Sequence, residues 1–296
     1  MSYTELHCHS NFSFLDGASH IEELVLRAGE LGQTALALTD HDGLHGAMEF
    51  AQCARAWGIR PITGAEITLA NPDGEADHHL TLLCENQRGY ANLCRLLTHA
   101  HLDHERGEPR VELNKLIQHT EGLIALSGCR GGEVPSLVAQ GLHREAEAAA
   151  RRYARAFGDG NFFLELQNNL VYGDTRRNRD LADLAEHLGL GVVATGDVHY
   201  HRQERHRLQD VLVAIKNRSS LDASHRQRRE NSEYHLRPGA EMAELFSDQP
   251  QAIANTQRIA ERCQFDLTRD LDYRFPDCPV PEGETAESYL RQICYR

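Results

Sequence analysis

The chain has 296 residues, enough for one large domain or two small ones with a buried core. It carries 31 Lys and Arg residues against 44 Asp and Glu residues, so the formal net charge is −13. The 25% of charged and 41% of hydrophobic residues exclude a disordered or fibrous protein. No apolar run approaches the roughly 18 residues of a membrane span. Histidines also stand where a signal peptide would carry its apolar stretch, so we expect a soluble cytoplasmic protein without a membrane partner.

Two residue types stand out in the composition. The eight cysteines are spread thinly along the chain, which does not indicate a disulfide framework, and in the cytosol they are expected to stay reduced. The 18 histidines exceed half the number of Lys and Arg residues. Because neutral imidazole is the commonest metal ligand in proteins, this number directs attention to metal sites.

The first predicted element is a helix that begins near residue 20. Ser19 and Glu22 have the spacing of a capping box, and apolar residues at helical spacing follow them: Ile21, Leu24, Val25, Ala28 and Leu31. Short apolar runs then predict strands at Ala35–Leu38, Ile62–Ala65, Leu80–Leu83, Leu123–Leu126, Phe162–Leu166 and Val192–Thr195. Helical patterns lie between them, around residues 44–57, 87–100, 142–157 and 176–188. Strands that alternate with helices predict a parallel sheet, either closed as a barrel or doubly wound.

The character of the sequence changes from about residue 217. Residues 217–231 are polar, and we interpret them as a solvated basic surface loop; their cations are Arg218, Arg226, Arg228 and Arg229. A helix with Pro250 near its start is predicted next, and prolines then favour an extended stretch over residues 275–281. An amphipathic helix starts at residue 288 and reaches residue 296 without a cap, so we expect the N-terminal part of a longer polypeptide.

Candidate metal ligands appear first near the N-terminus, at His7 and His9, with Asp16 shortly after them. In a strand, residues i and i+2 point to the same face, so the two imidazoles project together while Cys8 points away. Taken alone, such a pair is as compatible with a solvated surface pair as with a pair of ligands.

Further candidate ligands recur at one kind of position. Parallel folds of alternating strands and helices place their sites at the C-terminal ends of strands, and unrelated surface residues would have no reason to share that position. The residues that follow a predicted strand in this way are His41, Glu66, Cys129, Asp197 and His199. His79 precedes its apolar run and fits the pattern less well.

The types of candidate ligand narrow the chemistry. Imidazoles with carboxylates and one thiolate suit Zn²⁺, Mn²⁺ or Fe²⁺ better than Ca²⁺ or Mg²⁺, which prefer oxygen ligands. The candidates are too many for one tetrahedral ion and indicate a cluster of about two to three ions. Such clusters clamp the oxygens of a phosphoryl displacement and supply hydroxide at neutral pH, so phosphoester hydrolysis is the expected reaction class.

In chain order these residues resemble the ligand pattern of the PHP (polymerase and histidinol phosphatase) family. The resemblance implies an α/β fold, a distorted (βα)7 barrel similar to a TIM barrel, with a trinuclear metal site at the C-terminal ends of its strands. It implies that the metal ligands are His7, His9, Asp16, His41, Glu66, His79, Cys129, Asp197 and His199. No ligand is missing, so we expect two to three bound divalent ions, Zn²⁺ or Mn²⁺ first and Fe²⁺ as a further candidate. Catalysis is then expected to depend on Asp16 and His199, through the hydroxide that the metals supply.

Stretches outside the candidate site are similar to bacterial DNA polymerase III alpha subunits. These are residues 86–93 (NQRGYANL), 126–129 (LSGC), 245–246 (LF) and 259–263 (IAERC). Residues 233–236 (EYHL), with 209–212 (QDVL) before them, are most similar to the error-prone paralogue of damage-induced synthesis. The resemblance divides the chain into a barrel core over residues 1–216, a loop and helices that complete the domain over 217–263, and the start of a polymerase palm region over 264–296.

Three functions remain open from the sequence. The first is a metal-dependent phosphoesterase domain inside a DNA polymerase, acting as a 3′–5′ exonuclease in proofreading. The second is a separate phosphatase for histidinol phosphate or a nucleotide, and the third is a non-catalytic domain that metals brace. The polymerase-like stretches disfavour the second function, and the full ligand set disfavours the third.

The resemblance also implies partners. The catalytic aspartates of the palm, the thumb and the fingers lie outside this sequence, so this chain alone is not expected to polymerise DNA. The charge of −13 is opposite to the basic footprint of a DNA-binding protein. We therefore expect DNA to be held mainly by the remaining polymerase domains, with residues 226–229 as a minor contributor. Translesion accessory proteins are further implied partners.

Overall fold

The strands lie where the apolar runs predict them. The structure is a computed structural model that describes residues 2–72, 76–271, 273 and 279–295. Its strands are β1 Ala35–Leu38, β2 Arg60–Leu69, β3 His78–Cys84, β4 Leu123–Leu126, β5 Phe162–Gln167 and β6 Gly191–Thr195. Each of the six predicted strands is therefore confirmed, and β2 and β3 extend well beyond their predicted ends.

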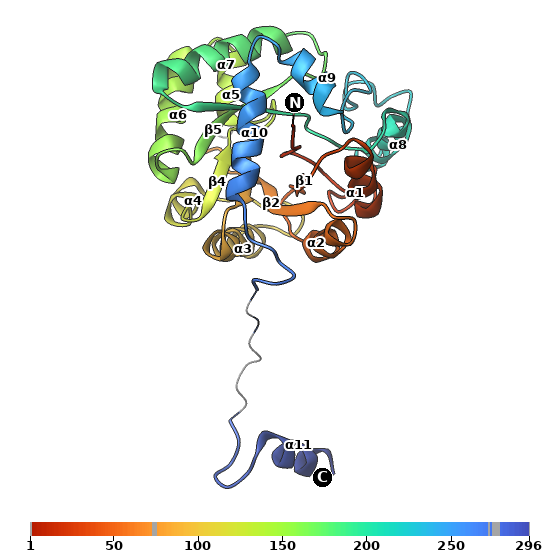
Figure 1. Ribbon diagram of the computed structural model, residues 1–296, viewed down its shortest axis with the longest axis vertical. Helices are drawn as coiled ribbons and strands as arrows, with labels where there is room; N and C mark the ends of the chain where they lie inside the picture. The colour runs from red at the N-terminus through yellow and green to blue at the C-terminus, as the bar shows by residue number, and fades with distance from the viewer. Residues whose placement is uncertain (1, 73–75, 272, 274–278, 296) are drawn as a thin grey trace.

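The helices surround these strands (Figure 1). They are α1 Ile21–Glu30, α2 Ala47–Ala56, α3 Gln87–Leu102, α4 Leu113–Gln118, α5 Glu133–Ala139, α6 His143–Phe157, α7 Asp174–Leu188, the 3-10 helix η1 Gln203–Arg205, α8 His206–Lys216, α9 Gly239–Leu245, α10 Pro250–Arg262 and α11 Ala286–Cys294. Helices α4 and α5 are too short for a helical period to show in the sequence. Helix α8 also escapes prediction, because apolar residues on it remain exposed, among them Leu208 and Ile215.

One strand runs against the predicted direction. The strand order is β1-β2-β3-β4-β5-β6, and β3 is antiparallel to both β2 and β4, whereas the other neighbours are parallel. The expectation of a wholly parallel sheet is therefore wrong at β3. The physical reason is the connection after β2, which contains no helix among its described residues and turns the chain straight back. As a result β3 starts at the edge where its neighbours end.

The N-terminal segment closes the sheet into a barrel. Glu5 bridges to Leu36 of β1, and Cys8 bridges to Val198 just after β6. Backbone hydrogen bonds hold both sides of the segment: the amide of Ala37 donates to the Glu5 carbonyl (2.9 Å), and that of His9 donates to the Val198 carbonyl (2.8 Å). This extended segment completes the barrel beside the six strands, so the distorted, TIM-like α/β barrel that the sequence predicts is confirmed.

Helix α10 plugs the barrel at the end where the parallel strands begin. Its Ile259 and Ala260, and Cys263 directly after it, pack in one buried cluster with Ala35 of β1 and Phe163 of β5. The side-chain amide of Asn255 donates to the Val192 carbonyl at 2.7 Å. In Figure 1 this helix lies across the strands. The opposite end of the barrel, where the parallel strands finish, stays available for polar loops.

The start of α1 differs from the prediction by one residue. The N-cap is His20, whose amide donates to the carboxylate of Glu23 at 2.9 Å. Ser19 instead shares a hydrogen bond of 2.7 Å with Nδ1 of His201 and accepts one from the amide of that residue. The predicted pair of Ser19 and Glu22 is wrong because a tertiary contact takes the serine hydroxyl away from the helix.

The C-terminal part of the chain agrees with the sequence where it is described. Residues 217–231 contain no helix or strand, and α10 begins at Pro250. Helix α11 begins two residues before the expected start at residue 288 and ends at Cys294. Figure 1 shows α11 apart from the barrel, and its Leu290 and Ile293 are exposed. The predicted extended stretch over 275–281 lies mostly outside the described residues.

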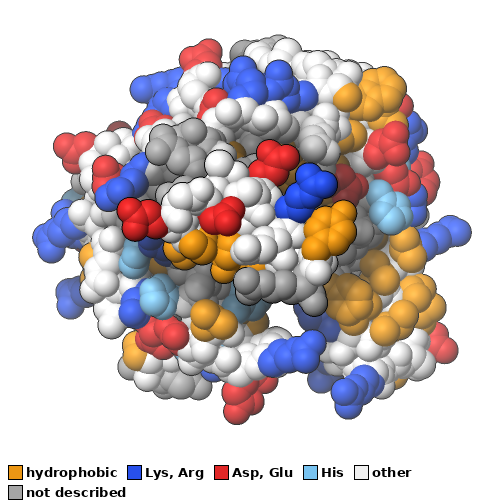
Figure 2. Space-filling view, turned by 90° about the horizontal axis from the view of Figure 1, so that it is seen from below, with side chains coloured by type: hydrophobic (Ala, Val, Ile, Leu, Met, Phe, Trp, Pro, Cys, Tyr) orange, Lys and Arg blue, Asp and Glu red, His pale blue; other side chains and the backbone are white. Residues whose placement is uncertain are grey.

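The surface mixes charges of both signs. On the face seen in Figure 2, acidic and basic side chains are interspersed over the whole outline. Every described cysteine is a free thiol, in line with the expected absence of disulfides. No helix within the described part of the chain has the length and apolar character needed to span a membrane.

Candidate metal centre

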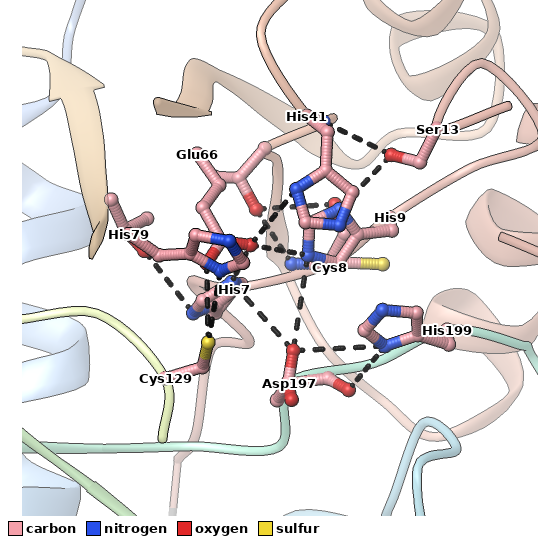
Figure 3. A network of polar contacts seen from close by, with 12 residues as sticks. His7, Cys8, His9, Ser13, His41, Glu66, His79, Cys129, Asp197 and His199 are labelled. Atoms are coloured by element: carbon pink, nitrogen blue, oxygen red, sulfur yellow. Dashed lines mark hydrogen bonds and ion pairs between the residues drawn. The ribbon is translucent and has the colours of Figure 1, made fainter. Parts of the chain in front are cut away.

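The carboxylate of Glu66, on β2, lies at the middle of the predicted ligands (Figure 3). Its Oε2 is 3.1 Å from Nε2 of His7 and 3.1 Å from Nε2 of His9. The other distances to this carboxylate are 3.4 Å from Nδ1 of His41, 2.7 Å from Nδ1 of His79 and 3.3 Å from Sγ of Cys129. Glu66 is almost fully buried. One carboxylate therefore gathers five of the predicted ligands.

The reversed strand explains why His79 belongs to this group. His79 stands at the start of β3, opposite Thr68 near the end of β2. Because β3 is antiparallel, its start lies at the same edge as the C-terminal ends of the parallel strands. There Nδ1 of His79 is 3.3 Å from Sγ of Cys129, which follows β4. Although His79 precedes its strand in the sequence, it therefore lies at the same end of the barrel as the other predicted ligands.

Asp16 and Asp197 connect the remaining ligands. Oδ2 of Asp16 is 3.0 Å from Nε2 of His41 and 3.4 Å from Nε2 of His199. Oδ1 of Asp197 is 3.6 Å from Nδ1 of His199 and 3.7 Å from Nε2 of His7. The structure therefore brings all nine predicted ligands into one continuous cluster.

Two imidazoles of the cluster are fixed from behind by residues that the sequence patterns do not single out. Nδ1 of His7 is 2.6 Å from Oε1 of the buried Glu165 on β5. Nδ1 of His9 is 3.0 Å from the Ser13 hydroxyl, which donates to Asp40 at 2.7 Å. Both contacts leave Nε2 facing Glu66. A hydrogen bond at one ring nitrogen in this way orients the imidazole so that its other nitrogen can bind a metal ion.

A signal for Glu165 does exist in the sequence. It is a carboxylate inside the apolar run Phe162–Leu166, and every residue of β5 is buried. Since a buried carboxylate needs a charged or hydrogen-bonding partner, a glutamate in such a strand indicates a polar site in the barrel.

Arg229 overturns part of the interpretation of residues 217–231. Its side chain is only 22% exposed, and its guanidinium lies 3.5 Å from Oδ2 of Asp197 and 3.7 Å from Oδ1 of Asp16. It also contacts His199 and stacks on the ring of Tyr234, 4.4 Å from the centroid. The prediction of a wholly solvated loop is wrong at this residue, because the carboxylates of the cluster attract its charge inward.

The charges of the cluster are set by burial and by neighbours. Burial raises the pKa of Glu66, but the imidazoles of His79, His7 and His41 bring it well below its usual value. Burial also opposes ionisation of Asp16, whose pKa His199 and Arg229 nevertheless lower well below the usual range. These carboxylates are therefore ionised at neutral pH.

The pKa values of His9 and Cys129 move in opposite directions. Burial, with His41 and His199 nearby, lowers the pKa of His9 well below its usual value, so this imidazole is neutral, as a metal ligand must be. Burial, together with the charge of Glu66, raises the pKa of the Cys129 thiol. This thiol keeps its proton until a cation replaces it.

The donor set fits a transition-metal cluster. Three groups of possible ligands have donor atoms within 4.8 Å of one another and share members: His9, His41 and His199; His7, His9 and Glu66; His41, Glu66 and His79. Although Nε2 of His9 lies close to Glu66, it makes no hydrogen bond among the described residues, and it is buried. A buried nitrogen without a hydrogen bond, aimed at carboxylates, is the arrangement that a bound cation would complete.

The family model described as the PHP domain matches residues 5–169, more than half of the chain. The chain belongs to the PHP family. Its relatives include an error-prone DNA polymerase of Symbiobacterium thermophilum, 44% identical over all of this chain and 28% of the relative. A DNA polymerase III subunit alpha of Treponema pallidum is 38% identical over all of this chain and 26% of the relative.

This chain spans about a quarter of the length of these relatives. A solved two-domain protein from Bacteroides vulgatus contains a predicted PHP-like metal-dependent phosphoesterase. It aligns with a TM-score of 0.42 and 17% identity over 67% of this chain and 52% of that chain.

Proposed function

We propose that this chain is a metal-dependent phosphoesterase domain and that its nine clustered residues are metal ligands. The observation that carries the proposal is that five imidazoles and one thiol converge on the three carboxylates of Glu66, Asp16 and Asp197. These side chains come from segments that are far apart in the sequence. A purely structural polar core would not need neutral His9 to face ionised carboxylates without a hydrogen bond.

The side chains divide the work. Two to three divalent ions, Zn²⁺ or Mn²⁺ first and Fe²⁺ as a further candidate, would lower the pKa of water and offset phosphate charge when bound. Asp16 lines a cavity of about 720 Å³ together with Arg229. Arg229 brings a positive charge to the place where a phosphate would enter. Catalysis is assigned to Asp16 and His199, which bind the metals there.

The similarity to DNA polymerases supports a proposal about the substrate of this activity and about the larger protein in which it acts. We propose that the substrate is DNA, trimmed at 3′ ends, and that the chain acts in the cytoplasm as part of a DNA polymerase III alpha-type, error-prone polymerase. In this proposal residues 1–216 form the catalytic barrel, 217–263 complete the domain, and 264–296 begin the palm region. The partners are DNA, the other polymerase domains and translesion accessory proteins.

The alternative functions make different predictions. A separate small-molecule phosphatase would share its closest similarity with phosphatases, whereas the relatives reported above are polymerases. A domain that metals only brace would bind the ions without hydrolysing any phosphoester.

The test compares the wild type with Asp16→Asn from matched preparations, because this change removes a ligand charge without altering the apolar core. Metal content is measured by mass spectrometry, and hydrolysis is followed on an aryl phosphate and on a labelled single-stranded oligonucleotide. We expect two to three ions per wild-type chain and a loss of activity in the variant of more than about 100-fold. The exposed Asp222→Asn is the control. Equal rates for wild type and Asp16→Asn would reject the catalytic assignment in favour of a contaminating nuclease.

A further inference from the structure

Two cavities adjoin each other beside the metal centre. The first, of about 720 Å³, is lined by Asp16 and Arg229 of the centre and by Arg130. The second, of about 910 Å³, is lined by Arg130 and by Tyr172. Arg130 lines both cavities, so a strand that runs from the metal centre along this residue would reach Tyr172.

Arg130 joins the segments around this space. It follows Cys129 directly in the chain, and its guanidinium is 2.7 Å from Oε1 of Glu230. The same guanidinium donates to the Tyr172 carbonyl at 3.4 Å. The ion pair with Glu230 is weak, because the two side chains are 35% and 55% exposed. A phosphate could therefore replace Glu230 at Nη1 of Arg130, while Nη2 stays 3.6 Å from Oδ1 of the buried Asp174.

The aromatic ring of Tyr172 is exposed to solvent. The residue is 100% exposed and lies between β5 and α7, next to Gly173, whose φ of +95° turns the chain at this point. Exposing a whole aromatic side chain at the wall of a cavity costs the protein hydrophobic burial. Exposed aromatic rings beside cationic grooves are the platforms on which bases of single strands stack.

The charge around the first cavity opposes that of the whole chain. Its lining contains two carboxylates, Asp16 and Glu230, against five cations: Arg130, Lys216, Arg226, Arg228 and Arg229. Two of these cations pair with carboxylates outside the lining, Arg228 with Asp210 at 2.9 Å and Arg229 with Asp197 at 3.5 Å, so the cations still exceed the carboxylates by one. Within a protein of net charge −13, this local excess of positive charge favours a polyanion. The second cavity adds space that a small phosphate monoester at the metal centre would leave empty.

We propose that the two cavities form one binding track for single-stranded nucleic acid, in which Arg130 holds a backbone phosphate and Tyr172 stacks on the adjoining base. This inference rests on the proposed function, which places the scissile phosphate at the metal centre. It adds that the substrate is an extended strand and that recognition begins at least one nucleotide away from the reaction.

The experiment measures binding, so it does not depend on hydrolysis. Fluorescence anisotropy gives the Kd of the full chain for a labelled oligothymidylate with phosphorothioate linkages, which resist cleavage. Tyr172→Ala is expected to raise Kd about tenfold, as the loss of one stacked base does, whereas Tyr172→Phe keeps the ring and the wild-type Kd. Tyr295→Ala, at a residue that is 83% exposed and lies directly after α11, is the control and is expected to leave Kd unchanged.

The contribution of Arg130 is read from the salt dependence. Arg130→Gln is expected to reduce the slope of log K against log salt by about 0.7, the effect of one phosphate contact to a single strand. Because Tyr172 is fully exposed, its variants are expected to fold as the wild type does. Equal Kd values for wild type and Tyr172→Ala, or no binding by the wild type, would overturn the track. If binding follows the expected pattern but no phosphoester is hydrolysed, the track stands and the proposed activity fails.

Discussion

Each imidazole of the metal centre has two ring nitrogens, and a ligand site needs both of them controlled. For His7 the second nitrogen meets Glu165 at 2.6 Å, and for His9 it meets Ser13 at 3.0 Å. These contacts fix which nitrogen carries the proton and where the other points. A motif of ligands in the sequence states which residues bind, but the orientation of the rings comes from residues far away along the chain.

Replacing Glu165 tests this orientation. In Glu165→Gln the side chain keeps its size and a carbonyl oxygen but loses the charge that holds His7. We expect metal affinity to fall by roughly 10- to 100-fold, the range typical of residues that support a ligand from behind. Competition with a chromogenic chelator measures the affinity, and the surface change Glu147→Gln serves as the reference. Unchanged affinity in Glu165→Gln would show that His7 is oriented without it.

Arg229 is the second residue whose role can be isolated. In Arg229→Gln the positive charge beside Asp16 and Asp197 is lost, so the negative charge of an entering phosphate is less well offset. We expect kcat on an aryl phosphate to fall by about 100-fold, comparable to the loss of one charge-stabilising donor. Arg179→Gln, an exposed arginine on α7, is the matched control. If Arg229→Gln keeps the wild-type kcat, Arg229 has a structural role alone, and the variant should then differ from the wild type in its melting temperature.

Sequence reasoning at this scale predicts the ligands but not the residues that orient them. The nine ligands are predicted from their residue types, from their places beside strands and from the resemblance to the PHP family, and the structure brings the nine residues together. Arg229 could not be placed, because a basic residue among polar neighbours has the pattern of a solvated loop. Only its distance to two carboxylates in the folded chain distinguishes it from Arg226, which stays exposed.

At the scale of elements, the direction of one strand decides the composition of the site. The apolar run Leu80–Leu83 predicts a strand but carries no information on its direction, because period and composition are the same for parallel and antiparallel neighbours. The pairing of Thr68 with His79 and of Glu66 with Thr81 fixes β3 as antiparallel. A parallel β3 would place His79 at the opposite end of the barrel, away from Cys129.

Helix α10 is the element whose contribution to stability can be measured most directly. Ile259 is fully buried against the barrel interior, so Ile259→Ala leaves a cavity where the plug meets the strands. We expect the free energy of unfolding to fall by about 2–5 kcal/mol, measured by urea denaturation. Glu261→Ala, at an exposed position of the same helix, is expected to change it by less than about 0.5 kcal/mol. A small effect at Ile259 would mean that α10 does not close the barrel.

At the scale of the whole molecule, the metal centre is a junction between segments that are distant in the sequence. Its predicted ligands come from the N-terminal segment, from the ends of β1, β2, β4 and β6, and from the start of β3. Without cations, Asp16, Glu66 and Asp197 share one buried region in which imidazoles and Arg229 offset their charge. Bound metals would therefore hold the barrel closed as well as carry chemistry.

Removal of the metals tests this role. An ion present at a hundredfold excess over its Kd stabilises the folded state by about 2.7 kcal/mol, which for a chain of this size corresponds to a shift in Tm of about 4 °C. We expect Tm, measured by scanning calorimetry, to fall by that amount or more after dialysis against a chelator and to recover when Zn²⁺ or Mn²⁺ is restored. In Asp16→Asn the same treatment should produce a smaller shift, because one ligand charge is already absent, whereas Asp222→Asn should behave as the wild type. If chelation leaves the Tm of the wild type unchanged, metal binding does not stabilise the fold. The stability of the barrel would then come from its apolar core and from α10.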